Sequence, residues 1–185
     1  MCSSGSRSRR RRGGGLSGMN RGTSGRSAAA AMATVTLIAP LLGSSAEPTA
    51  PKYVAGATAF EANCAVCHGH DGAGTPSLAP PLTSYPARYA ASAEGRRQLA
   101  ITVLYGMFGE VVVDQKHYNF KMPDFTRLDD SALAEVLNFV IFDLGHAPES
   151  TKPLTSEEIA AERRQPLDGA AVRERRVSVL AALGL

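Results

Sequence analysis

The sequence predicts a small all-α protein, interrupted by one extended segment before a methionine and followed by a helical C-terminal tail. Apolar residues recur at helical spacing over 130–144, and a second apolar helix is expected over 95–107. The tail contains the capping-box pattern Thr155-Ser-Glu-Glu158, which marks the start of another helix. A length of 185 residues allows one domain with tails.

The N-terminal 46 residues are expected to be a secretory signal peptide. They hold seven arginines and no acidic residue, and an apolar run over 28–42 precedes the small residues Gly43 to Ala46. Cleavage before Glu47 would place the protein in the periplasm, and Met19 is an alternative start of the same signal. The other interpretation is an uncleaved membrane anchor, which the short run and Pro40 disfavour.

The basic charge of the chain belongs to this segment. The formal net charge is +3, but residues 47–185 hold 13 basic and 17 acidic residues. A nucleic-acid-binding function inferred from the overall charge therefore fails once the segment is removed. The rest of the chain is expected to comprise a linker over 47–52, a domain over 53–147 and the helical tail over 148–185.

The motif Cys64-Ala-Val-Cys-His68 carries the most specific chemistry. A disulfide between Cys64 and Cys67 would close a very short loop and constrain the unfolded chain little. A zinc site usually takes four ligands, and no second paired cluster is present. A thioredoxin-like pair should follow a strand, whereas residues 56–63 look helical. The spacing fits covalent attachment of haem c, in which each thiol adds to one vinyl group and His68 lies under the iron.

A second iron ligand is expected further along the chain. Outside the signal peptide, the methionines are Met107 and Met122. Pro123 favours an extended backbone at Met122, which lets the sulfur point inward, so Met122 is the expected ligand. Met107 ends an apolar helix, where core packing is the simpler role, and it remains an alternative together with His117.

The segment from about 52 to 147 resembles a class I cytochrome c. The markers of that family are a glycine and an aromatic residue on the first helix, the haem motif, a glycine-rich loop, Pro-Pro-Leu, Met-Pro and a final helix. In this sequence they are Gly56, Phe60, 64–69, 69–74, 80–82, 122–123 and 130–142, in the order that the family has. The resemblance implies a small class I cytochrome c fold around one covalently bound haem.

The resemblance also implies a role for each of these positions. Cys64 and Cys67 would form the thioethers, and His68 and Met122 would be the axial ligands of the iron. The carbonyl of Pro81 would accept a hydrogen bond from the free ring N–H of His68. Gly56 would allow the first and last helices to cross closely, with Phe60 and Phe139 packed at the crossing.

Two further features stay open at this point. The sequence has no Trp, so a partner for the haem propionates must come from elsewhere. The candidates are Tyr85, Arg88, Tyr89, Arg96, Arg97 and Tyr118. Residues 109–119 alternate enough for a short hairpin or an ordered loop, which resembles stretches in cytochrome subunits of periplasmic dehydrogenases.

The implied function is single-electron transfer between a dehydrogenase-type donor and an acceptor such as a terminal oxidase. An iron with six ligands leaves no position for substrate, so no enzymatic activity is expected. Residues 47–150 hold 7 basic and 12 acidic residues, which favours a partner with a basic patch. The alternative is a haem protein with an open or displaceable sixth site, acting as a peroxidase or gas sensor. The tail would either wrap the domain or dock a partner.

Overall fold

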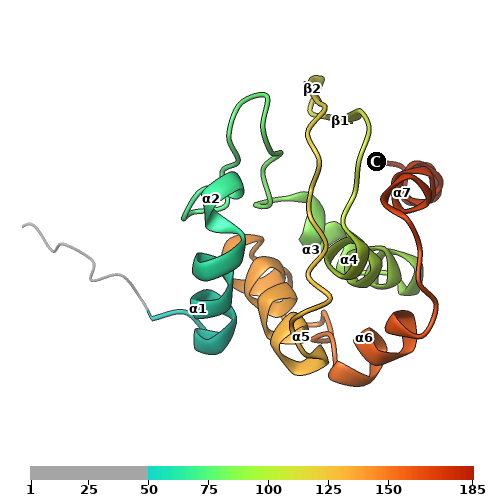
Figure 1. The fold of residues 1–185 in the computed structure, drawn as a ribbon. Helices are drawn as coiled ribbons and strands as arrows, with labels where there is room; N and C mark the ends of the chain where they lie inside the picture. The colour runs from blue at the N-terminus through green and yellow to red at the C-terminus, as the bar shows by residue number, and fades with distance from the viewer. Residues whose placement is uncertain (1–49) are drawn as a thin grey trace, which may run out of the picture. The chain divides into compact units, whose positions relative to one another are not determined.

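The computed structural model describes residues 50–185, and the predicted signal peptide over 1–46 lies outside them. Figure 1 shows a predominantly helical chain with one small hairpin, as the sequence predicts. None of the helices in the described part of the chain is long and apolar enough to span a membrane. The elements in chain order are α1 Val54–Asn63, α2 Ala65–His68, α3 Tyr85–Ala90, α4 Ala93–Tyr105, β1 Val111–Val113, β2 Lys116–Tyr118, α5 Asp130–Asn138, a π-helical turn η1 Phe139–Leu144, α6 Ser156–Arg163 and α7 Gly169–Leu183.

Helices α1 and α5 cross at Gly56, which confirms the close approach expected there. A Cβ on Gly56 would lie 2.1 Å from the carbonyl oxygen of Glu135, so the two backbones touch only because this position has no side chain. Phe60 and Phe139 pack beside the crossing with ring centroids 5.3 Å apart, and both are buried. The crossing therefore fixes the first helix, and with it the motif that follows.

The final helix of the domain begins regularly and ends in a wider turn. Asp129 caps α5, with its carboxylate accepting a hydrogen bond from the Ala132 amide at 2.7 Å. The helix then continues as η1 and ends at Gly145. Asp143 in η1 accepts the backbone amides of Lys52 and Tyr53 at 2.6 and 3.0 Å. Asp143 thus ties the residues that immediately precede α1 to η1.

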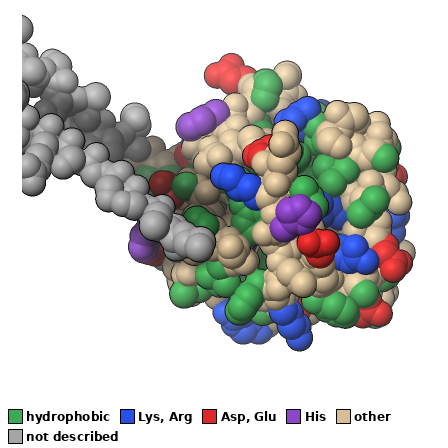
Figure 2. Space-filling view, turned by 90° about the horizontal axis from the view of Figure 1, so that it is seen from above, with side chains coloured by type: hydrophobic (Ala, Val, Ile, Leu, Met, Phe, Trp, Pro, Cys, Tyr) green, Lys and Arg blue, Asp and Glu red, His purple; other side chains and the backbone are tan. Residues whose placement is uncertain are grey.

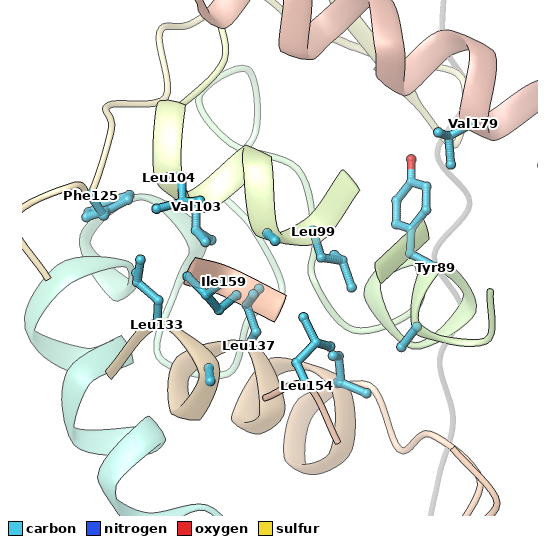
Figure 3. Close-up of a cluster of buried hydrophobic side chains, with 14 residues drawn as sticks. Tyr89, Leu99, Val103, Leu104, Phe125, Leu133, Leu137, Leu154, Ile159 and Val179 are labelled. Atoms are coloured by element: carbon cyan, nitrogen blue, oxygen red, sulfur yellow. The ribbon is translucent and has the colours of Figure 1, made fainter. Parts of the chain in front are cut away.

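The main core lies where α4 meets α5 and the two tail helices (Figure 3). Leu104 of α4, Leu133 of α5 and Ile159 of α6 are almost fully buried there. Val179 of α7 joins the same cluster. Residues 148–185 therefore wrap the domain, which is the first of the two arrangements considered for the tail.

Ion pairs between arginines and carboxylates join the tail helices to the rest of the described chain. Arg96 of α4 donates two hydrogen bonds to the carboxylate of Glu158, at 2.8 and 2.6 Å, and further bonds to the carbonyls of Lys152 and Pro153. Arg163 of α6 pairs with Asp130 at 2.7 Å. The predicted capping box of Thr155 and Glu158 is formed, so Glu158 serves both its own helix and the arginine on α4.

The extended segment forms the short hairpin that the sequence allows. Strands β1 and β2 pair antiparallel, with Val111 opposite Tyr118. Asp114 and Gln115 at the tip both have positive φ, which a two-residue hairpin turn of this hand requires. Below the hairpin the two segments pair once more, where Met107 lies opposite Met122. The hairpin therefore fixes the segment that carries Met122.

Candidate functional site

A largely apolar cavity of about 230 Å³ lies between α2, α4, α5 and the hairpin segment. Residues from most of the described chain line it, from Phe60 on α1 to Arg176 on α7. All five predicted site residues are among them, namely Cys64, Cys67, His68, Pro81 and Met122. The structure thus brings together residues that lie far apart in the sequence.

The two motif cysteines are placed by a break in the first helix. Cys64 ends α1, and the chain turns into the four-residue helix α2, which carries Cys67 and His68. Both thiols are free, and each is partly buried at the cavity wall. Burial raises the pKa of the Cys64 thiol to about 11, so this group is neutral at ordinary pH. Two thiols one helical turn apart on one wall suit two bonds to a single flat ligand.

His68 is buried at the same wall, with its ring held by the backbone. Its Nδ1 lies 2.9 Å from the carbonyl oxygen of Pro80. A carbonyl can only accept, so Nδ1 carries the proton and Nε2 keeps a free lone pair. Burial lowers the pKa of His68, against a smaller opposing effect of this hydrogen bond. The imidazole is therefore held neutral and oriented, which a metal ligand requires.

The prediction that the carbonyl of Pro81 accepts the hydrogen bond from His68 was wrong by one position. The acceptor is the carbonyl of Pro80, and Pro81 only lines the cavity. The loop register explains the difference. Gly74 donates to the carbonyl of His68 at 2.7 Å, and Leu82 donates to the carbonyl of Gly72 at 2.8 Å. Pro80 precedes a proline and so favours an extended backbone, in which neighbouring carbonyls point in different directions. With these two bonds made, the carbonyl of Pro80 is the one that faces the ring.

Met122 and Met107 lie opposite each other where the two segments below the hairpin pair. The amide of Met107 donates to the carbonyl of Met122 at 3.1 Å, and the amide of Met122 donates back at 2.8 Å. Residues paired in this way place their side chains on one face, and both methionines line the cavity. Gly106 permits this arrangement, because its φ is +68° and a Cβ there would lie 2.4 Å from the oxygen of Met122.

The histidines outside the motif lie elsewhere. His117, the alternative ligand, is exposed on β2, with its Nδ1 2.8 Å from Glu110, and it does not line the cavity. His70 and His146 are also exposed. Within residues 50–185, no three His, Cys, Asp or Glu side chains gather as a metal site would require. His68, Met107 and Met122 are therefore the candidate iron ligands that reach the cavity.

The polar part of the cavity includes two residues that the sequence did not single out. Of the six candidates for the propionates, Tyr85, Tyr89 and Tyr118 line the cavity, whereas Arg96 and Arg97 pair with carboxylates of α6. Gln98 and Arg176 also line it, and both are buried. No motif points to Arg176, since it lies in the tail among other arginines.

These residues fit a covalently attached haem. The apolar cavity would hold the macrocycle, the two thiols on one wall would bond to its vinyl groups, and the neutral imidazole of His68 would bind its iron. The cavity also contains two buried polar atoms without hydrogen-bond partners, the Tyr89 hydroxyl and Gln98 Oε1. A purely apolar ligand would leave both atoms unsatisfied. A haem, which is apolar with two carboxylates, meets both requirements.

The comparisons with known proteins agree with this chemistry. The family model for cytochrome c matches residues 53–141. Cytochrome c-552 of Thermus thermophilus is 37% identical over 108 residues, covering 57% of this chain and 82% of the relative. A second cytochrome c-552, from a strain of the same species, has the same identity over 73% of its length. The chain belongs to the cytochrome c family, as a class I monohaem c-type cytochrome that carries haem c and transfers electrons.

Proposed function

We propose that this protein is an exported electron carrier whose haem iron is held between His68 and Met122. The observation that supports the proposal is that both side chains line one cavity, from α2 and from the segment after β2. The hydrogen bond to Pro80 leaves Nε2 of His68 free to bind. When bound, haem supplies the one-electron chemistry, with iron alternating between its ferrous and ferric states.

The residues of the chain would retain and tune the cofactor. Thioethers at Cys64 and Cys67 prevent haem loss, and a methionine sulfur as the second ligand favours the ferrous state and raises the potential. Apolar side chains such as Phe125, Leu137 and Val140 line the cavity and exclude water, which further disfavours the extra positive charge of ferric iron.

We propose that the partner binds where the cavity reaches the surface. Val66 and Phe120 line the cavity and are 83% and 63% exposed, so an apolar rim is available to another protein. On the face that includes the hairpin and the loop after α2, side chains of both charges are interspersed (Figure 2). The acidic excess of residues 47–150 would speed encounter with a basic partner, while the rim supplies the contact. A dehydrogenase as donor and a terminal oxidase as acceptor fit this role.

The export proposal depends on the N-terminal segment. Haem c attachment takes place outside the cytoplasm, so a cleaved signal over 1–46 and a periplasmic haem domain with its tail are mutually consistent. The intact mass of the matured protein tests the cleavage site before Glu47. A mass that retains the apolar run would instead support a membrane anchor.

The central test is an optical spectrum of the full chain, matured in an exporting host that attaches haem. A low-spin haem c spectrum with the weak methionine–iron charge-transfer band, unchanged by carbon monoxide, is expected. A high-spin spectrum, or one that changes with carbon monoxide in the unmodified protein, would contradict ligation by His68 and Met122. It would favour an open sixth position and the chemistry of a peroxidase or gas sensor.

A further inference from the structure

Arg176 is a buried cation without an anion. It lies on α7, is 8% exposed and lines the haem cavity. Among residues 50–185 it makes no ion pair, whereas its neighbour Arg175 pairs with Glu94 on α4. A guanidinium that is largely withdrawn from water without a counter-charge is unfavourable in a protein interior. A negative group is therefore expected in the cavity beside Arg176.

Two polar groups that line the same cavity have no hydrogen-bond partner of ordinary geometry. The side chain of Tyr89 extends from α3 toward α7 (Figure 3), and its hydroxyl lies near Arg176 without a hydrogen bond of ordinary geometry in the described structure. Burial raises the pKa of Tyr89, while the nearby charge of Arg176 opposes that rise. Tyr89 therefore keeps its proton and is available as a donor.

Gln98 shows how this part of the cavity is tied to the tail. Its amide nitrogen donates to the carbonyl of Val172 on α7 at 3.2 Å and to Thr102 at 3.1 Å, and its Oε1 is left without a partner. Because the nitrogen faces a carbonyl that can only accept, Oε1 is the atom left to accept a donor. Arginine has five N–H donors, enough to bind a carboxylate with two of them and still serve Gln98.

We infer that Arg176, together with the hydroxyl of Tyr89, binds a propionate of the haem, so that the C-terminal tail is part of the haem site. The inference rests on the haem attachment argued above. The propionate supplies the missing anion, and Arg176 and Tyr89 supply donors that the apolar remainder of the cavity lacks. Haem then bridges α2 and α7, and docking of the tail depends on the cofactor.

The test uses the full-length holoprotein with Arg176→Leu, Arg176→Lys and, as a matched control, Arg175→Leu on the same helix. Arg176→Leu removes a positive charge beside the haem and should therefore favour ferric iron. At a fixed applied potential, the ratio of ferrous to ferric protein should fall roughly three- to tenfold. The propionate bending mode in the resonance Raman spectrum should shift, and amides of α7 should exchange faster. Arg176→Lys should restore part of the ratio, and Arg175→Leu should leave the haem measurements unchanged.

An Arg176→Leu protein that folds with an unchanged potential and propionate mode would overturn the inference and leave Arg176 a packing residue. If this variant does not mature, Tyr89→Phe decides, because it removes only the hydroxyl. A shifted propionate mode in Tyr89→Phe supports the inference, and an unchanged mode overturns it. Failure of the proposed axial ligation is separate, since it would appear as a missing methionine–iron band in the unmodified protein.

Discussion

Replacing Gly56 with alanine tests whether the α1–α5 crossing holds the haem motif in place. The added Cβ would lie 2.1 Å from the oxygen of Glu135 and 2.9 Å from the Cβ of Phe139. Ordinary contact begins near 3.4 Å, so the helices must separate by about 1.3 Å. A gap of that size forfeits much of the dispersion energy between the facing side chains, including Phe60 and Phe139.

The expected loss follows from these terms. Overpacking costs about 1–3 kcal/mol, and weakening the aromatic pair about 1 kcal/mol more. The better helix propensity of alanine returns about 1 kcal/mol. The holoprotein carrying Gly56→Ala should therefore lose about 1–3 kcal/mol of its free energy of unfolding.

Urea denaturation of the holoproteins, followed by far-UV circular dichroism, measures this loss. Ala62→Gly on the exposed face of α1 is the control, because it reverses the same change in propensity without touching α5. We expect it to cost about 1 kcal/mol. If Gly56→Ala were as stable as the unmodified protein, or more stable, the backbone contact would not be tight and the reasoning would be refuted.

Three further predictions concern the methionine segment and the tail. Met122→Ala should lower the midpoint potential and let carbon monoxide bind, whereas Met107→Ala should do neither; the reverse pattern would identify Met107 as the ligand. Gly106→Ala should weaken the methionine–iron band and destabilise the protein by at least ~1 kcal/mol, since a positive φ and the nearby oxygen of Met122 both oppose a Cβ; an unchanged band and stability would argue against it. Glu158→Gln should cost about 1–2 kcal/mol at pH 7, measured by urea denaturation. Arg96 lowers the pKa of Glu158 below its ordinary value of 4.5, so this contribution is present above pH 4.5 and is lost as the pH falls through the folded-state pKa. Equal losses at pH 7 and pH 3 would show that the carboxylate charge is not involved.

Much of the fold could be predicted because local and long-range requirements coincide in the same residues. Asp129, Asp168 and the Thr155–Glu158 pair cap helices as their types and positions indicate. Gly56 and Phe60 could be placed at a helix crossing because the family resemblance implies one there. Cys64, Cys67, His68 and Met122 could be expected at one cavity because the motifs occur in the order of the family that the sequence resembles.

Other features depend on geometry that a linear pattern does not carry. Choosing between Pro80 and Pro81 requires the register of the loop, which two backbone hydrogen bonds set. The π-helical turn η1 follows α5 without a break in its apolar periodicity, so one regular helix was expected. Arg176 differs from Arg175 only in which side of α7 it occupies, and its burial becomes visible once α7 is seen packed on α4.

The pairing of early with late elements also sets when the haem site can close during folding. Helix α1 packs on α5, and α4 packs on α7, so the cavity walls come from segments that are far apart in the chain. Until α7 has packed on α4, the cavity that Cys64 to His68 line stays open. Both thiols are accessible at that stage, so haem attachment competes with docking of the final helix.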